Sequence, residues 1–318
     1  MVGLEFVNTQ GVANAIDLPA RNHAIPVTMN PLADFHHRRG ASFYETPQAL
    51  WCPAGAFSIY SAPSSLAVGV DRREMESALR TTRRLLAIAS PPRDTGLEGK
   101  AFILRDKNYG PHSLQRQFRQ QVKKSSQHCG VAPIDWTTLS RSALPVNRSL
   151  CLRGRELHSG IDREEIWLRF CDAAAATPGM EAWGVSAAGE LLAYMVVLEW
   201  NGFCHGLHMN WSGSRPEWHP THLLYYETAR ALMARPHIHA FGTGRQTLPA
   251  NPGVDRFKTH AGFQPEPIPL AIVAHPRWRI FLEKFHACFP TALRRRFPIL
   301  RNLEAPEAAA LVRRAGKF

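Results

Sequence analysis

The second half of the chain contains side chains that can accept a proton from a nucleophile. His208 and Asn210 are two residues apart in an apolar run, so an extended strand would place both on one face of a sheet. Tyr226, with its neighbours Tyr225 and Glu227, lies in the next predicted helix. An imidazole or a phenol within reach of a substrate is a typical general base or acid. His208 and Tyr226 are therefore candidate catalytic residues, and Asn210 is a candidate substrate ligand.

A second group of polar residues follows, and it is suited to binding an anion. Arg245 and Arg256 carry planar guanidinium groups, which hold a phosphate or a carboxylate through two parallel hydrogen bonds. Asn251 offers an amide between them. Lys258 ends the group, and a fixed ammonium would stabilise the negative charge that develops on a reacting carbonyl oxygen. Lys258 is therefore a candidate catalytic residue, and the other three are candidate substrate or donor ligands.

Residues 113–129 are predicted to form a basic amphipathic helix. Leu114, Phe118 and Val122 recur at helical spacing and define an apolar face. The other faces carry several basic residues, among them Arg119 and Lys123. Because a cationic face attracts phosphate groups, these two are candidate ligands of a polyanion such as coenzyme A, a carrier protein or tRNA.

No metal or nucleotide motif accompanies these residues. The 15 His and 6 Cys have spacings that match no zinc pattern, and no Cys-x-x-Cys pair occurs. The sequence also lacks a Gly-x-Ser-x-Gly elbow and a P-loop, which argues against a serine hydrolase and an NTPase. We therefore expect no metal centre.

Composition and charge indicate a folded, basic protein. Of 318 residues, 45% are hydrophobic and 20% are charged, as in ordinary globular chains. The net charge is +12, and residues 276–318 contribute ten basic and three acidic side chains to it. No uncharged stretch approaches the roughly 20 residues of a membrane span, and no signal peptide is visible. We expect a cytoplasmic protein with reduced cysteines, whose basic tail can contact an anionic membrane.

The hydrophobic periodicity predicts alternating helices and strands. In the second half it predicts a helix, three antiparallel strands, a helix, a strand, a short helix and a last strand, at residues 162–177, 181–185, 191–200, 203–211, 222–233, 238–242, 254–260 and 268–273. In the first half it predicts a strand at 57–60, a helix at 72–89 and a strand at 101–104, before the basic helix. A meander followed by a crossover helix is typical of a mixed sheet, so the predicted fold class is α/β (α+β).

One block of the second half resembles the signature of FemAB-like acyltransferases of the GNAT superfamily and of BioF2-like acetyltransferase domains. The block comprises Phe241-Gly-Thr-Gly244, residues 251–258 and Ala261-Gly-Phe263. The resemblance implies two tandem GNAT-like subdomains with mixed sheets, a reaction centre in the cleft between them, and Lys258 in the active site. It implies an irregular segment at 1–45, an N-terminal subdomain at 46–155, a C-terminal FemAB-type subdomain at 156–275 and a basic helical tail at 276–318.

The resemblance also implies a reaction, the transfer of an acyl group from a thioester of coenzyme A or a carrier protein to an amine. The glycine loop that binds the coenzyme A pyrophosphate in ordinary GNAT enzymes has one literal match, at residues 127–132. That match follows a helix and precedes a strand, the reverse of the required order. Two alternatives therefore stay open: an aminoacyl-tRNA-dependent peptidyl or aminoacyl transferase, and a non-catalytic basic module that binds a membrane or an assembly.

Overall fold

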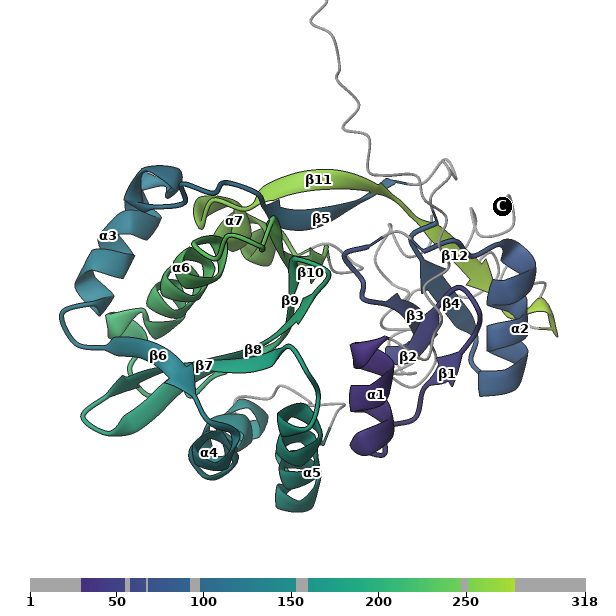
Figure 1. Cartoon of the computed structure of the whole chain (residues 1–318), viewed down its shortest axis with the longest axis horizontal. Coiled ribbons are helices and arrows are strands. Elements are labelled where there is room, and N and C mark those ends of the chain that lie inside the picture. The colour runs from purple at the N-terminus through teal and green to yellow at the C-terminus, as the bar shows by residue number, and fades with distance from the viewer. Residues whose placement is uncertain are drawn as a thin grey trace, which may run out of the picture.

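Two β-sheets organise the chain (Figure 1). The computed structural model describes residues 30–54, 58–66, 68–91, 98–152, 160–246 and 251–277. The strands are β1 Tyr44–Glu45, β2 Leu50–Ala54, β3 Ser58–Ala62, β4 Leu86–Ala89, β5 Glu98–Leu104, β6 Gly130–Ile134, β7 Met180–Ala187, β8 Glu190–Trp200, β9 Phe203–Trp211, β10 Ala240–Arg245, β11 Gln264–Pro269 and β12 Ala271–Ala274. The helices are α1 Pro31–Arg38, α2 Arg72–Thr82, α3 Arg116–Ser125, α4 Trp136–Leu152, α5 Glu164–Ala175, α6 Pro220–Met233 and α7 Pro252–His260.

The two sheets repeat one arrangement of strands. The five-stranded sheet has the order β1-β2-β3-β4-β12, and the seven-stranded sheet has the order β11-β5-β10-β9-β8-β7-β6. β1, β2 and β3 are antiparallel neighbours, and β4 follows α2 and pairs in parallel with β3. In the same way β7, β8 and β9 are antiparallel, and β10 follows α6 and pairs in parallel with β9. The predicted fold class, two mixed α/β units in tandem, is confirmed.

The repeated arrangement has five strands, β1-β2-β3-β4-β12 in one sheet and β7-β8-β9-β10-β5 in the other. In each case the fifth strand, β12 or β5, comes from the other half of the chain. β5 follows β4 in the sequence but pairs with β10, whereas β12 follows β11 and pairs back with β4. β6 also precedes the predicted boundary at residues 155 and 156, and it pairs with β7. Each sheet therefore contains strands from both sides of that boundary, so a division of the chain at this point does not follow the sheets.

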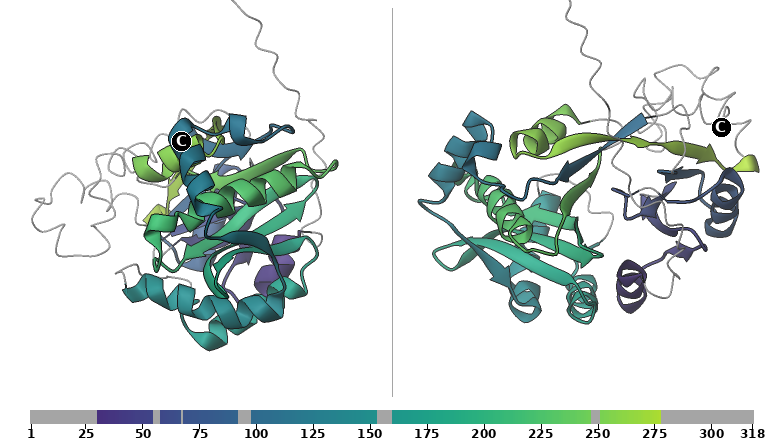
Figure 2. Two further views of the ribbon diagram at one scale, coloured as in Figure 1. Left: turned by 90° about the vertical axis from the view of Figure 1, so that its left-hand side faces the viewer. Right: turned by 45° about the horizontal axis from the view of Figure 1, so that its top comes forward.

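Helices cover both faces of the seven-stranded sheet (Figures 1 and 2). Alternate residues of β8 point to opposite faces, as in any strand. Met195 and Val197 pack in one core with α3 and α6, while Tyr194 and Val196 pack in another with α1, α4 and α5. This division decides which of the candidate residues can meet.

The hairpins of the meander form at the predicted turn dipeptides. Ala188 and Gly189 have φ of 49° and 82°, and Asn201 and Gly202 have φ of 50° and 72°. Two successive positive φ angles make the type I′ turn, whose twist matches that of the flanking strands. β8 and β9 accordingly begin within one residue of their predicted starts.

Several elements differ from the sequence-based expectation. β1 and β2 were not predicted, and the basic helix predicted at 113–129 is the shorter α3. The helix predicted at 72–89 ends at Thr82, because Arg83 adopts a left-handed φ of 55°, and Leu86 then begins β4. The strand predicted at 268–273 is divided at Leu270 into β11 and β12, which belong to different sheets. α1 lies in the segment predicted to be irregular, and α4 was not predicted.

The predicted basic tail at 276–318 lies outside the described residues except for its first two. Within the described part of the chain, no helix has the length and apolar run that crossing a membrane requires.

Candidate functional site

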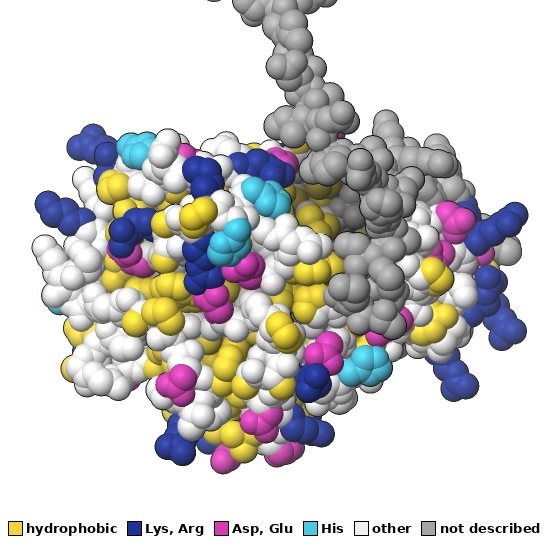
Figure 3. All heavy atoms as spheres, viewed as in Figure 1, with side chains coloured by type: hydrophobic (Ala, Val, Ile, Leu, Met, Phe, Trp, Pro, Cys, Tyr) yellow, Lys and Arg dark blue, Asp and Glu magenta, His cyan; other side chains and the backbone are white. Residues whose placement is uncertain are grey.

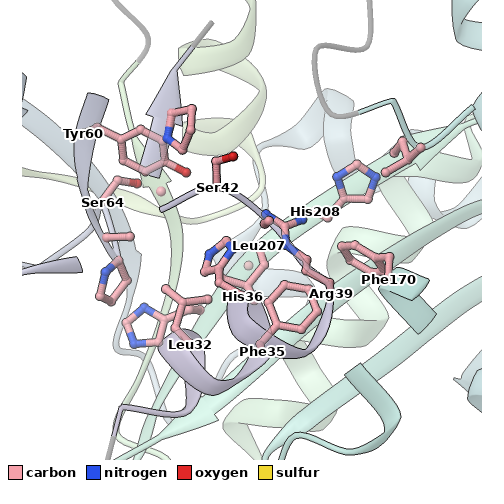
Figure 4. A pocket seen from close by; sticks show the side chains of 18 of the residues that line it. Leu32, Phe35, His36, Arg39, Ser42, Tyr60, Ser64, Phe170, Leu207 and His208 are labelled. Atoms are coloured by element: carbon pink, nitrogen blue, oxygen red, sulfur yellow. Dashed lines mark hydrogen bonds between the residues drawn. The ribbon is translucent and has the colours of Figure 1, made fainter. Parts of the chain in front are cut away.

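A cavity of about 890 Å³ lies between the two sheets, where α1 and the end of β3 face α5 and β9. Arg39 and Tyr60 reach it from the first half of the chain, and His205 and His208 reach it from the second. Figure 4 shows Tyr60 across the cavity from His208, with Ser42 between them. The structure therefore contains the cleft that was predicted between the two units.

The cavity lies where two parallel strands separate. β9 and β10 pair from Phe203 with Ala240 to His205 with Gly242. Beyond this point the two strands separate: β9 stays paired with β8, and β10 stays paired with β5. Gly206, the next residue of β9, lines the cavity. A strand edge without a neighbour has peptide groups that can hydrogen-bond another chain or ligand. Among the described strands none pairs with this edge of β9 beyond His205, so its backbone donors and acceptors can bind a ligand.

A bulge in β9 turns His208 toward the cavity. β8 pairs Val196 with His208 and Val197 with Gly206, so Leu207 has no partner in β8. An extra residue of this kind re-aims the side chains beside it. As a result, the consecutive residues Leu207 and His208 both line the cavity.

His208 ends a hydrogen-bond network whose polarity is fixed at its far end. Asn147 donates from Nδ2 to the carbonyl of Ile161 at 3.1 Å, so its Oδ1 faces the network. The Tyr194 hydroxyl donates to this Oδ1 at 2.6 Å, and Asn210 donates to it at 2.8 Å. His208 Nε2 lies 3.0 Å from the Tyr194 hydroxyl oxygen. Because the phenol has one proton and donates it to Asn147, Nε2 of His208 is the donor and Nδ1 is unprotonated.

His208 is therefore a neutral imidazole with one free acceptor atom. Burial, and secondarily the charge of Arg39, lowers the pKa of His208 to about 4. No described residue hydrogen-bonds its Nδ1. As predicted, His208 and Asn210 share one face of β9, since both bond the Tyr194 hydroxyl. His208 lines the cavity, whereas Asn210 is buried behind it and orients the network.

Arg39 follows α1, and its positive charge acts on His208. Its Nε donates to His36 Nδ1 at 3.1 Å, and its guanidinium carbon lies 5.0 Å from the ring centroid of Phe35 and 5.9 Å from that of Phe170. His36 Nε2 in turn lies 3.4 Å from Cys52 Sγ. Since His36 Nδ1 accepts, its proton is on Nε2, and burial lowers the pKa of His36 to about 3. A neutral histidine thus holds the guanidinium beside two aromatic rings that contact each other edge to face.

Further arginines make the cavity strongly cationic. Arg84 and Arg169 line it, and among the described lining residues there is no Asp or Glu. Arg245, a predicted ligand, lies beside the cavity and acts electrostatically on Tyr60. Burial lowers the pKa of Arg245 to about 10, so it keeps its charge at neutral pH, and its buried Nη1 has no hydrogen-bond partner in the described structure.

Lys258 occupies a different position from the one its prediction implied. It is 6% exposed and does not line this cavity, and its Nζ donates to the carbonyl of Thr243 at 2.8 Å, above the ring of Phe102. Burial lowers the pKa of Lys258 to about 8. Its neighbour Phe257 is partly buried and packs against the core that contains α3 and α6. Lys258 therefore braces β10 next to Gly244, which lines the cavity.

The other predicted residues lie away from the cavity. Tyr226 packs against Tyr109 in the core shared with α3 and α6. Asn251 caps α7 by accepting from the amides of residues 253 and 254. Arg256, Arg119 and Lys123 are exposed. The structure thus brings His208, Asn210 and Arg245 to one region and separates them from this second set.

The core face of the basic helix was predicted correctly. Leu114, Phe118 and Val122 are buried, while Arg119 and Lys123 face solvent. Lys and Arg side chains stand out from the surface over α3 (Figure 3).

Three functional candidates had no sequence signal of their own. Arg39 and His36 lie in a segment that was predicted to be irregular, although Asn30 before Pro31 is a helix start signal, and Asn30 does accept from the Leu32 amide at 3.0 Å. Tyr194 stands in an apolar strand, where a core role was the natural interpretation. Within the described residues, no three His, Cys, Asp or Glu side chains come together as a metal site.

The architecture is similar to that of solved structures at low sequence identity. FemX has a TM-score of 0.51 and 12% identity, covering 79% of this chain and 93% of its own. The C-terminal domain (DUF2156) of a putative lysylphosphatidylglycerol synthetase from Agrobacterium fabrum has a TM-score of 0.50 and 10% identity, covering 77% and 87%. A tandem GNAT protein from the clavulanic acid biosynthesis pathway has a TM-score of 0.46 and 14% identity, covering 72% and 79%. No protein-family model matches the sequence, and neither does any curated protein. The likeness concerns the fold.

Proposed function

We propose that the protein is an acyltransferase of the GNAT superfamily that moves an acyl group from a thioester, of coenzyme A or of a carrier protein, to an amine. The fold shared with FemX supports a transferase of this kind. One observation carries the proposal: an unprotonated His208 Nδ1 faces a cavity at the point where β9 and β10 separate. A base beside a free strand edge is suited to a reaction that removes a proton from a bound nucleophile.

A single base, His208, is enough for the proton transfers of the reaction. The amine nitrogen attacks the acyl carbon, a C–N bond forms, and the thioester C–S bond breaks. The proton lost by the amine passes to His208 Nδ1 and then to the departing thiolate. The imidazole is neutral before the step, as a proton acceptor must be. Nε2 remains bonded to Tyr194 throughout, so the ring keeps its orientation.

The substrate carbonyl also needs donors for its developing negative charge. Peptide groups along the free edge of β9 beyond His205 are available for this purpose. The role of Lys258 in stabilising this negative charge stays a prediction. Lys258 would act on the cavity indirectly, through the Thr243–Gly244 backbone.

An aminoacyl-tRNA donor is the second candidate, and the exposed basic face of α3 favours it. In that case a C–O ester bond breaks in place of the C–S bond, with the same base. Arg119 and Lys123 would contact the donor outside the cavity. Contact of the basic tail with an anionic membrane, and a cytoplasmic location, belong to this proposal as well.

The test is release of a free thiol from a panel of acyl-coenzyme A thioesters, with and without added amines, by the full-length chain. We expect amine-dependent thiol release, and we expect His208→Gln to lower it by about 10²–10⁴-fold. His237→Gln is the matched control, since His237 is exposed and pairs with Glu199 outside the cavity.

A parallel assay with charged tRNA distinguishes the two donors. Consumption of aminoacyl-tRNA without thioester turnover would select the second candidate. Equal activity of His208→Gln and the wild type would refute the role of His208 with either donor. Absence of both activities in a folded protein would favour the remaining alternative, a non-catalytic basic module.

A further inference from the structure

Arg39 is a half-buried cation without an anionic partner. Its guanidinium lies beside the rings of Phe35 and Phe170 and is fixed by His36, but no described carboxylate pairs with it. Its neighbour behaves differently, because Arg38 is exposed and pairs with Asp34 at 2.8 Å. The two adjacent arginines therefore differ in the one property that matters for a ligand: only Arg39 lines the cavity.

Burying a positive charge is costly unless an opposite charge compensates it. The faces of the two aromatic rings stabilise the guanidinium by a modest amount, but they carry no net charge. His36 is neutral and accepts a single hydrogen bond. The remaining N–H groups of Arg39 can thus bind an anion that arrives from outside. A fork of this shape matches a carboxylate or a phosphate group in particular.

The surroundings of Arg39 define the rest of such a ligand. Leu32 and Phe35 of α1, Ile166 and Phe170 of α5, and Leu207 of β9 form apolar walls of the same cavity. Figure 4 shows Phe35, Phe170 and Leu207 near Arg39, with Leu32 on the other side of His36. A small hydrophilic anion would leave these walls in contact with water, whereas an aliphatic or aryl group attached to the anion would cover them.

We propose that the cavity holds an amphiphilic anion, with its carboxylate or phosphate on Arg39 and its apolar part against the walls formed by α1, α5 and β9. The proposal rests on the proposed function only in calling this ligand a substrate. An ammonium group has no counter-charge among the described lining residues, so the amine substrate is not anchored here through its own charge. The anion on Arg39 instead lies beside His208, where it places the attached reactive group near Nδ1.

Isothermal titration of the full-length chain tests this class of ligand without any turnover. The probes are octyl phosphate, octanoate, octylammonium and octyl glucoside, each below its micelle concentration, together with inorganic phosphate. We expect at least one of the two octyl anions to bind tenfold or more tightly than octylammonium, octyl glucoside and inorganic phosphate. The preference between octyl phosphate and octanoate identifies which anionic group Arg39 takes.

Three variants locate the binding to Arg39. Arg39→Gln should weaken the preferred octyl anion by about 10–100-fold, and Arg39→Lys by less, because a lysine keeps the charge but loses the planar fork. Arg38→Gln, the adjacent control, should bind as the wild type does. Thermal unfolding of each variant verifies that it is folded.

The proposal is overturned if no octyl anion binds the wild type, if octylammonium or octyl glucoside binds as tightly, or if folded Arg39→Gln keeps full affinity. None of these results depends on acyl transfer. Binding with the expected selectivity but no thiol release would overturn the proposed function alone.

Discussion

Tyr60 and His205 occupy the same position in two equivalent strand pairs, one in each sheet. Tyr60 forms the last rung of the parallel pair β3–β4, opposite Ile88, and His205 forms the last rung of β9–β10, opposite Gly242. Both line the cavity, and Ser65, just after β3, lies with its Oγ 3.2 Å from His205 Nδ1. The cavity therefore lies between two strand separations that face each other, one from each half of the repeat.

Acid should destabilise the protein before its carboxylates are protonated. Burial lowers the pKa of His205 and of His208 to about 4, against 6.5 for an exposed histidine. Between these values the unfolded chain binds more protons than the folded one, so stability falls as the pH drops from about 6.5 to about 4. Each of the two histidines contributes on the order of 2–3 kcal/mol over this range. Urea unfolding at pH 7, 5.5 and 4.5 measures the decline.

His205→Gln should flatten that decline, since glutamine does not titrate. His112→Gln is the control, because the His112 side chain is 69% exposed. A pH dependence of His205→Gln as steep as that of the wild type would contradict the prediction.

Tyr194→Phe should allow His208 to populate both of its neutral tautomers. Without the phenol oxygen, the Nε2 proton loses its acceptor, and the proton distributes between the two ring nitrogens. Nitrogen-15 NMR of the imidazoles reports this directly, as a shift of His208 Nδ1 away from the unprotonated value. Turnover should fall by roughly 10–100-fold, the usual effect of removing a group that orients a functional histidine.

Tyr109→Phe provides the comparison for this variant. The Tyr109 hydroxyl is also buried and donates to the Ala261 carbonyl at 2.6 Å, but on the other face of the sheet. Tyr109→Phe should lower the free energy of unfolding by about as much as Tyr194→Phe does, and it should leave the His208 spectrum unchanged. An unaltered spectrum in Tyr194→Phe would show that the network does not set the tautomer.

Lys258→Met should lower turnover by about two orders of magnitude in a protein that still folds and binds donor. The Thr243 carbonyl loses its bond from Nζ, and the adjacent Gly244 borders the cavity. Lys258→Arg should also be impaired, because a guanidinium is larger and directs its donors differently. Steady-state kinetics with the identified substrate make the measurement.

Lys107→Met separates a local effect from a general loss of stability. Lys107 Nζ likewise donates to main-chain carbonyls, those of Arg235 and Ile238, each at 2.7 Å. Lys107→Met should be destabilised to about the same degree as Lys258→Met but should keep normal turnover. Near-normal turnover of folded Lys258→Met would end the assignment of Lys258 to the site.

Charge reversal on α3 tests whether its exposed face binds a polyanion. Arg119→Glu with Lys123→Glu should weaken binding of tRNA or of coenzyme A, and the loss should shrink as salt rises. Arg73→Glu with Arg80→Glu makes the same change in net charge on α2. Fluorescence titration at two salt concentrations compares the pairs, and equal affinities of both pairs would count against a site on α3.

Elements whose start and end depend on neighbouring residues were predictable from the sequence. The meander β7–β9 follows from alternating apolar residues and two turn dipeptides, whose positive φ angles are local properties. The shared face of His208 and Asn210 follows from the two-residue period of a strand. The buried stripe of α3 follows from the helical period in the same way.

The cavity depends on contacts between distant segments, which no local pattern reveals. Arg39 is about 170 residues from His208, and the two meet only because α1 packs on α5. The bulge at Leu207 changes which side chains face the cavity, and it is set by the pairing of β8 with β9. The role of Leu270 is similar, since nothing in an apolar run shows that its two halves join different sheets.

The exchange of strands between the sheets has a consequence for synthesis on the ribosome. β4 meets β12 through Ala89 and Ala271, about 180 residues apart in the chain. At about 5–20 residues per second, the edge of β4 remains uncovered for roughly 10–40 s after it is made. An open, uncharged edge such as Leu86–Ala89 can pair with other nascent chains during that interval. The nascent protein is therefore expected to need a chaperone until its last described strand emerges.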